Sequence, residues 1–201
     1  MPSAQGFGQL TPEDLSSPFN VTSFIIRQAL ANVRTVQLVS VKSSTSNGQI
    51  APPGTVNVQP LVNMLDGQGN SQSHGTVYNI PIWRFGSGLG QIIADPQAGD
   101  IGIIAVIDRD ISSVKNTNGQ QSNPSSLRQF SLSDGVYLGT LFGKAPKQYI
   151  VFTSTGISIV DINNNSFGSG PAGWAMSGNV TLGSAAKPIV FTVNGVPMTI
   201  P

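Results

Sequence analysis

Apolar and polar positions follow two different periods along the chain. Between Pro18 and Ala31 the apolar residues recur at helical spacing, and Ser17 and Pro18 suit the cap and first turn of a helix. From Arg34 onward the period changes to two, which is the spacing of a half-buried strand. The pattern predicts one helix followed by strands. The expected inner face of the helix consists of Phe19, Ser23, Ile26, Leu30 and Val33.

Strand-like segments separated by turn sequences fill residues 34–143. Pro60 places its strand at an edge or a bulge, since proline cannot donate to a ladder. A short polar helix or turn is expected over Asp108–Lys115. The predicted strands cover Arg34–Val41, Thr55–Met64, Thr76–Phe85, Ile101–Ile107 and Phe130–Leu138. One helix, five strands and a helical insertion before the last strand resemble a small closed barrel of the OB type.

Residues 144–201 differ in kind from this barrel. An almost unbroken β pattern runs over Tyr149–Ile162, and a Gly/Asn-rich loop is expected over Asn163–Gly173. Further strands are expected over Asn179–Leu182 and Ile189–Ile200, the latter broken at Gly195. The sequence therefore indicates an N-terminal arm and helix (1–33), a barrel domain (34–143) and a β-rich tail (144–201).

The tail is too short to enclose a core of its own. Isolated hairpins are marginal in water, and the chain has no cysteine to staple them. The apolar residues of the tail must be buried elsewhere, and identical copies of the same segment are the most economical partner. The expected oligomer interface consists of Ile150, Phe152, Ile157, Ile159, Phe191, Val193 and Val196.

Composition narrows the class of protein further. Only 9% of residues are charged while 39% are hydrophobic, and Lys plus Arg (10) nearly balance Asp plus Glu (9). The basic residues are scattered singly, so no cluster could neutralise consecutive phosphates, and nucleic-acid binding is not expected. Neither a secretion signal nor an 18-residue apolar stretch is present. We expect a protein that is made in the cytoplasm and stays soluble.

Candidate ligand and catalytic residues each have a simpler structural interpretation. His74, the single histidine, lies in a Ser/Gly loop without the companions that a metal ligand or a general base needs. Asp108 and Asp110 flank Arg109, and could hold Ca²⁺ or cleave a glycoside, but a turn with local ion pairing is the favoured interpretation. No catalytic, metal-binding or cofactor-binding residue is predicted, and the protein is not expected to be an enzyme.

The remaining motifs favour structural roles as well. Ser131 and Ser133 before Asp134 suit a turn or cap, because no Gly-x-Ser-x-Gly motif surrounds them. Gly86–Gly90 lacks the lysine of a phosphate-binding loop and is expected to form a flexible hairpin tip. The aromatic residues that could form a sugar-binding platform, or pack in a core or interface, are Trp83, Phe85 and Trp174.

Short motifs in order along Thr55–Phe142 resemble one known family. They are VNVQPL from Val56, YNIPIW from Tyr78, AGDIG from Ala98, DRD from Asp108 and RQFSLSDG from Arg128. Together they are similar to the N-terminal domain of the membrane-piercing central spike proteins of contractile phage tail baseplates. The match covers nearly half of the chain.

The resemblance implies a homotrimer with an OB-fold collar and a short intertwined β-helical or β-prism needle. It also implies a virion protein that docks in a baseplate hub protein and contacts the host outer membrane transiently. The family's needle commonly ends in a metal held by His-x-His pairs, but the C-terminus here carries no such ligands. A separate tip protein is therefore an expected partner. The alternative is an adhesin-like or carbohydrate-binding module.

Overall fold

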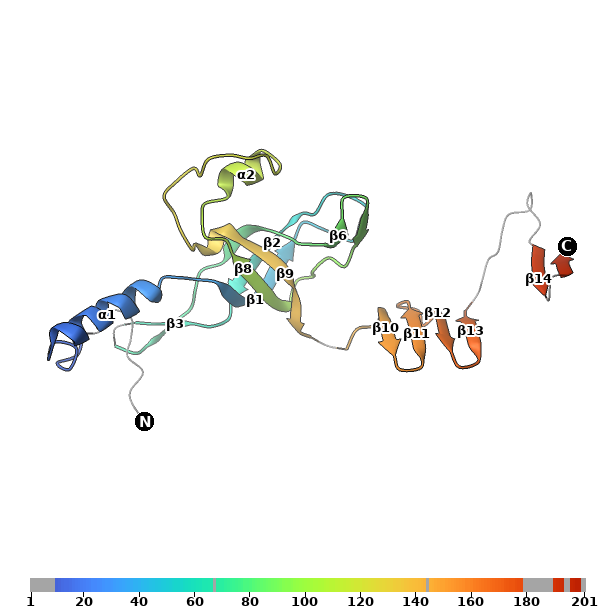
Figure 1. The fold of residues 1–201 in the computed structure, drawn as a ribbon, viewed down its shortest axis with the longest axis horizontal. Helices are drawn as coiled ribbons and strands as arrows, with labels where there is room; N and C mark the ends of the chain where they lie inside the picture. The colour runs from blue at the N-terminus through green and yellow to red at the C-terminus, as the bar shows by residue number, and fades with distance from the viewer. Residues whose placement is uncertain (1–9, 67, 144, 179–189, 194–195, 200–201) are drawn as a thin grey trace. The chain divides into compact units, whose positions relative to one another are not determined.

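A computed structural model describes residues 10–66, 68–143, 145–178, 190–193 and 196–199 (Figure 1). The fold is mainly β, with 40% strand and 13% helix, as the alternating pattern predicts. The chain divides into two compact units, Met1–Gly143 and Lys144–Pro201. No helix in the described ranges is both long and apolar enough to cross a membrane.

The N-terminal helix α1 spans Pro18–Leu30, which confirms the predicted helix apart from its last residue. The Oγ of Ser17 caps it by accepting a hydrogen bond from the backbone N–H of Asn20 at 3.2 Å. Asp14 holds the preceding turn, because its carboxylate accepts from the N–H of Thr11 and pairs with Arg27 at 2.6 Å. No residue of α1 is buried, so its apolar side is uncovered by the part of the chain that the structure describes.

The first unit is built on a five-stranded antiparallel sheet. Its spatial order is β5-β2-β1-β8-β9. The strands are β1 (Val36–Ser44), β2 (Thr55–Pro60), β5 (Val77–Pro81), β8 (Ile101–Val106) and β9 (Gly135–Phe142). The sheet is open except near one end, where Ile82 forms a parallel bridge with Tyr137 of β9. There the N–H of Trp83 donates to the carbonyl of Tyr137 at 2.9 Å, so the two edges of the sheet meet.

The core of this unit lies on the inner face of the sheet. Val39 and Val41 of β1 are fully buried, as are Val56 and Val58 of β2, which confirms the period-two pattern of both strands. The remaining buried apolar residues are Ile80, Ile82, Ile104, Leu132 and Tyr137. Branched side chains thus fill the space between the strands.

Smaller elements extend from the sheet. They are the hairpin β3 (Met64–Leu65) and β4 (Ser71–Gln72), the hairpin β6 (Phe85–Ser87) and β7 (Gly90–Ile92), the helix α2 (Ser112–Asn116) and the 3-10 turn η1 (Leu132–Asp134). The predicted strand over Thr76–Phe85 is wrong in extent, because β5 ends at Pro81 and β6 begins at Phe85. Between them the chain leaves β2 to meet β9.

The second unit contains a four-stranded antiparallel sheet in chain order. Its strands are β10 (Tyr149–Thr153), β11 (Gly156–Val160), β12 (Ser166–Gly170) and β13 (Gly173–Ser177). The expected loop over Asn163–Gly173 is wrong, because β12 lies within it. This strand has the sequence SFGSG, in which Phe167 is the one apolar residue among glycines and serines of low strand propensity. Its sequence therefore shows no strand pattern.

A separate hairpin follows toward the C-terminus. It pairs β14 (Val190–Val193) with β15 (Val196–Thr199). The strand expected over Ile189–Ile200, broken at Gly195, is present as β14 and β15 on either side of residues 194–195. The strand expected over Asn179–Leu182 lies outside the described residues.

Candidate interaction surface

The four-stranded sheet of the second unit has one apolar face. Opposed residues on neighbouring strands share a face, and the register pairs Ile150 with Ile159, Ile159 with Phe167, and Phe167 with Met176. A second row beside the first pairs Phe152 with Ile157. We call this surface the apolar face; it consists of Ile150, Phe152, Ile157, Ile159, Phe167, Trp174 and Met176.

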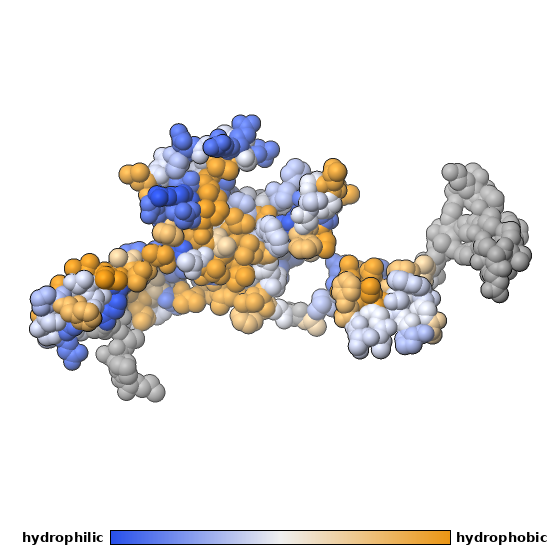
Figure 2. Space-filling model, viewed as in Figure 1, coloured by the Kyte–Doolittle hydropathy of each residue, from blue (hydrophilic) through white to orange (hydrophobic). Residues whose placement is uncertain are grey.

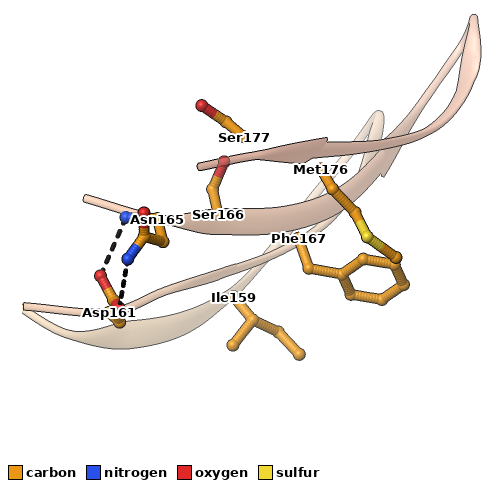
Figure 3. A pocket seen from close by; sticks show the side chains of 7 residues that line it. All are labelled: Ile159, Asp161, Asn165, Ser166, Phe167, Met176 and Ser177. Atoms are coloured by element: carbon orange, nitrogen blue, oxygen red, sulfur yellow. Dashed lines mark hydrogen bonds between the residues drawn. The ribbon is translucent and has the colours of Figure 1, made fainter. Parts of the chain in front are cut away.

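The opposite face carries small side chains in its middle. Ser158 opposes Gly168, and Gly168 opposes Ala175. Figure 3 shows this division directly, since Ile159, Phe167 and Met176 point to one side of the sheet while Ser166 and Ser177 point to the other. Tyr149, Val151 and Val160 add apolar side chains to this second face at β10 and β11. The difference between the two faces is therefore clearest over β12 and β13.

Within residues 145–178, no part of the sheet covers the apolar face. None of the described residues from 145 to 178 is buried. Phe152 is 75% exposed and Trp174 65% exposed, although Trp174 stacks on Phe167 with ring centroids 5.0 Å apart. Figure 2 shows apolar residues gathered at the surface over β10 and β11. A contiguous exposed apolar surface of this kind marks an interaction site.

Four of the predicted interface residues belong to this face, namely Ile150, Phe152, Ile157 and Ile159. Their side chains point the same way, as an interface requires. The other three lie in β14 and β15, whose pairing is described but whose side chains are not: Phe191, Val193 and Val196. The sequence prediction missed Phe167, Trp174 and Met176, although Trp174 was considered as an aromatic platform.

A turn closes one end of the apolar face. Asp161 Oδ1 accepts hydrogen bonds from the backbone N–H groups of Asn163 and Asn165, both at 2.8 Å, and Asp161 Oδ2 accepts from Asn165 Nδ2 at 2.9 Å (Figure 3). Hydrogen bonds from Asn165, followed by that from Asn163, lower the pKa of the Asp161 carboxyl. This carboxylate is committed to its own turn, which fixes the connection between β11 and β12.

The turn and the sheet enclose an open hollow of about 300 Å³. It is lined by Ile159, Asp161, Asn165, Ser166, Phe167, Met176 and Ser177 (Figure 3). Across the part of the chain that the structure describes, no three His, Cys, Asp or Glu residues gather as metal ligands would. Because Ile159, Phe167 and Met176 line it, the hollow continues the apolar face toward polar side chains at the end of the sheet.

His74 lies in the loop between β4 and β5 and is half-buried. Burial, together with the positive charge of Arg34, lowers the pKa of the His74 imidazole. The loop expected at this position is confirmed.

The aspartates of the DRD motif have separate roles. Asp108 forms only a long, exposed ion pair with Arg109, at 4.0 Å. Asp110 is buried and accepts hydrogen bonds from Ser126 Oγ at 2.6 Å and from Arg128 at 2.9 Å. Hydrogen bonds from Ser112 and Ser126 are the main reason that the pKa of Asp110 is far below its ordinary value.

Arg128 connects the segment that leads into α2 with η1, the 3-10 turn before β9. Its guanidinium lies between Asp110 and Asp134, with Arg128 Nε donating to Asp134 at 2.7 Å. The predicted ion pairing of Asp110 is thus with Arg128 rather than with its neighbour in sequence. Because both carboxylates pair with the same guanidinium, Arg128 holds Asp110 and Asp134 together in a structural role.

The other candidate motifs also take structural positions. Ser131 caps η1 by accepting from the N–H of Ser133, which confirms the predicted cap. Gly86–Gly90 forms the tip of the β6–β7 hairpin. Trp83 and Phe85 contact edge to face at 6.0 Å, but both are more than half exposed, so they do not belong to the core.

The buried ion pair between Arg84 and Asp95 was not predicted from the sequence. Arg84 donates through Nε and a terminal nitrogen to both oxygens of Asp95, at 2.9 and 2.8 Å. Arg84 also donates to the carbonyl of Ala51, and Asp95 accepts from the N–H of Gly48. The hydrogen bonds from Arg84 are the main cause of the lowered pKa of Asp95. This cluster fastens the β1–β2 loop to the base of the β6–β7 hairpin.

Comparison with known proteins adds no family. No protein-family model matches the chain, and no curated protein matches it significantly. The apolar face is the candidate interaction site among the described residues.

Proposed function

We propose that this protein is a non-enzymatic homotrimer, the central spike of a contractile phage tail baseplate. In this role the first unit is the collar that docks in the hub protein, and the second unit begins a needle that helps to puncture the host envelope. The observation that carries the proposal is the apolar face of the second unit, whose residues are exposed among the described residues 145–178.

The energetics favour association of this face with its own copies. Burying a large apolar side chain fully is worth about 1.5–3 kcal/mol, so each half-exposed member of the face gains on the order of 1 kcal/mol when covered. A sheet without a buried residue is not expected to persist alone. Rotation about a threefold axis would bring three such faces together, and each copy would supply the core that the others lack.

The first unit supports the collar assignment. Its strand order, and the parallel contact between Ile82 and Tyr137 where the edges meet, fit the partly open Greek-key barrel of an OB fold. The motifs that resemble the spike family lie at structurally constrained positions in it. One example is Asn79 of YNIPIW, which has a positive φ of 58° and donates its N–H to Asn57 of VNVQPL.

One observation supports a second candidate function, carbohydrate binding. Trp174 is exposed and stacks on Phe167, and Phe167 lines the hollow together with the polar side chains of Asp161 and Asn165. Aromatic faces next to hydrogen-bonding groups are typical of sugar sites. Micromolar binding on a glycan array by the intact protein, lost in Trp174→Ala, would favour this function.

Sedimentation of the full chain tests the trimer. We expect the mass of three copies at micromolar concentration for the wild type. Phe152→Ser removes a large side chain from the apolar face of each copy and is expected to shift the chain toward a single copy. Val151→Ser, on the opposite face of the same strand, is the matched control and should remain trimeric. A wild-type mass of one copy, or a loss of association only with Val151→Ser, would contradict the proposal.

Cross-linking of intact phage tails tests the location. Lys147 is exposed next to the start of β10 and is available to a lysine-reactive reagent. Mass spectrometry should find its peptide joined to the same peptide of another copy and to neighbouring baseplate proteins. Absence of this chain from purified tails would contradict the baseplate assignment.

A further inference from the structure

Helix α1 has a second uncovered apolar surface, in a different part of the molecule. Phe19 is 78% exposed and Leu30 62% exposed, and Ile25 and Ile26 are each more than half exposed. Figure 2 shows apolar side chains at the surface along this helix. A helix of 13 residues is marginal in water by itself, so most of its stability must come from contacts of that surface.

The other side of α1 is already in use. Val21 and Phe24 are half-buried. Arg27 is held by Asp14, and Asn20 Nδ2 donates to the carbonyl of Glu13 at 2.9 Å. The described part of the arm before the helix thus packs on this side and leaves the opposite surface of α1 exposed.

The spacing on the uncovered surface is that of a coiled coil. Phe19 and Ile26 are seven residues apart, as the a positions of a heptad are, and Thr22 and Ala29 occupy the d positions between and after them. Ile25 and Leu30 fall on the flanking g and e positions and widen the apolar stripe. A stripe that includes e and g suits a bundle of more than two helices.

Charge favours copies of the same helix as the partner. None of the positions on this surface is charged, and the nearest charged group, Arg27, points outward to Asp14. Identical helices can therefore meet side by side without repulsion between like charges. A partner selected by charge would need complementary charges at the e and g positions, and the sequence has none there.

We infer that α1 packs through Phe19, Ile26 and Leu30 against the α1 helices of two further copies, as a short parallel three-helix bundle. This inference rests on the proposed trimer. Two heptads are too few to hold three chains together from dilute solution. Once the second unit joins the copies, the helices meet at high effective concentration, and the bundle becomes a second point of association at the N-terminal end.

The absence of cysteine makes the test direct. Ala29→Cys places one spin label per copy on the inner surface of the full-length protein, and Gln120→Cys places one on an exposed loop after α2 as the control. We expect strong dipolar broadening of the electron paramagnetic resonance spectrum for the label at position 29 and none at position 120. Adding Phe19→Ser and Ile26→Ser to Ala29→Cys should abolish the broadening without changing the sedimented mass.

The outcomes separate the two proposals. A trimeric mass with a broadened label at position 29 alone supports the helix bundle. A trimeric mass without broadening at position 29 overturns the bundle and leaves the spike proposal standing, with α1 then covered by another protein such as the hub. A monomeric mass overturns both.

Discussion

Single residues join parts of the first unit that the strand ladders do not connect. Arg84 and Asp95 are the most enclosed example, with side chains 3% and 1% exposed. Both carboxylate oxygens and three guanidinium nitrogens have partners within this cluster. A charge in such a place is stable only while its partner is present, because the protein interior solvates ions poorly.

Arg84→Met is therefore expected to destabilise the first unit strongly. It leaves the Asp95 carboxylate buried without a cation, and removing one partner of a buried pair costs about 3–5 kcal/mol. Asp95 can take up a proton instead, which places the expected loss near the lower figure. Urea unfolding, followed by the fluorescence of Trp83 in a Trp174→Phe background, measures the change in the free energy of unfolding.

Arg109→Met is the matched control for this substitution. Its ion pair with Asp108 is exposed and 4.0 Å long, and exposed pairs contribute about 0–1 kcal/mol. The control is expected to unfold at nearly the wild-type urea concentration. Equal losses for the two variants would show that the burial of the Arg84–Asp95 pair does not determine its importance.

At the scale of elements, close contact between β8 and β9 depends on a glycine. A Cβ at Gly102 would collide with the backbone carbonyl of Gly139 and with the ring of Tyr137. Both obstacles are packed into the edge of the sheet that meets Ile82. This explains in physical terms why the AGDIG motif has its second glycine inside a strand.

Gly102→Ala is expected to push β9 away from β8. Overpacking of this kind costs about 1–3 kcal/mol, and the same fluorescence-monitored unfolding measures it. Gly88→Ala, at the open tip of the β6–β7 hairpin where a Cβ meets no atom, is the control and should change stability little. If Gly102→Ala had the same free energy of unfolding as the wild type, β8 and β9 could move apart without loss of stability.

Elements with a strong period were predictable from the sequence, and those without one were not. Helix α1 has both a cap and a helical period, and β1 and β2 alternate cleanly. β12 (SFGSG) has one large apolar residue among small ones, so no window of its sequence indicates a strand. Its place is set by pairing with β11 and β13, which is a tertiary effect that sequence pattern does not contain.

The candidate surface was predictable only in part for the same reason. Ile150 and Phe152 lie in a strongly apolar strand, but Met176 joins their face only through the register across β12. Arg84 and Asp95 could not be identified as partners, because their meeting depends on how the β6–β7 hairpin folds back. Long-range pairing of single charged residues leaves no periodic signal.

At the scale of the whole molecule, the two units differ in how each is stabilised. The first unit encloses a core that includes Val39, Val58 and Ile104 at 0% exposure. The second, over its described residues from 145 to 178, buries none. Backbone ordering costs on the order of 1–2 kcal/mol per residue, and ladder hydrogen bonds alone do not offset this cost in water. In the proposed trimer, the neighbouring copies would supply the burial that these residues lack.

This difference predicts how the two units behave when they are expressed separately. Residues 1–143 should retain their sheet, because their core is internal. Residues 144–201 should be either trimeric or unstructured, because their apolar face has no cover within one copy. Circular dichroism and sedimentation of each fragment measure this. A well-folded single copy of residues 144–201 would contradict the needle, since it would mean that the exposed side chains of β10 to β13 find burial within their own chain.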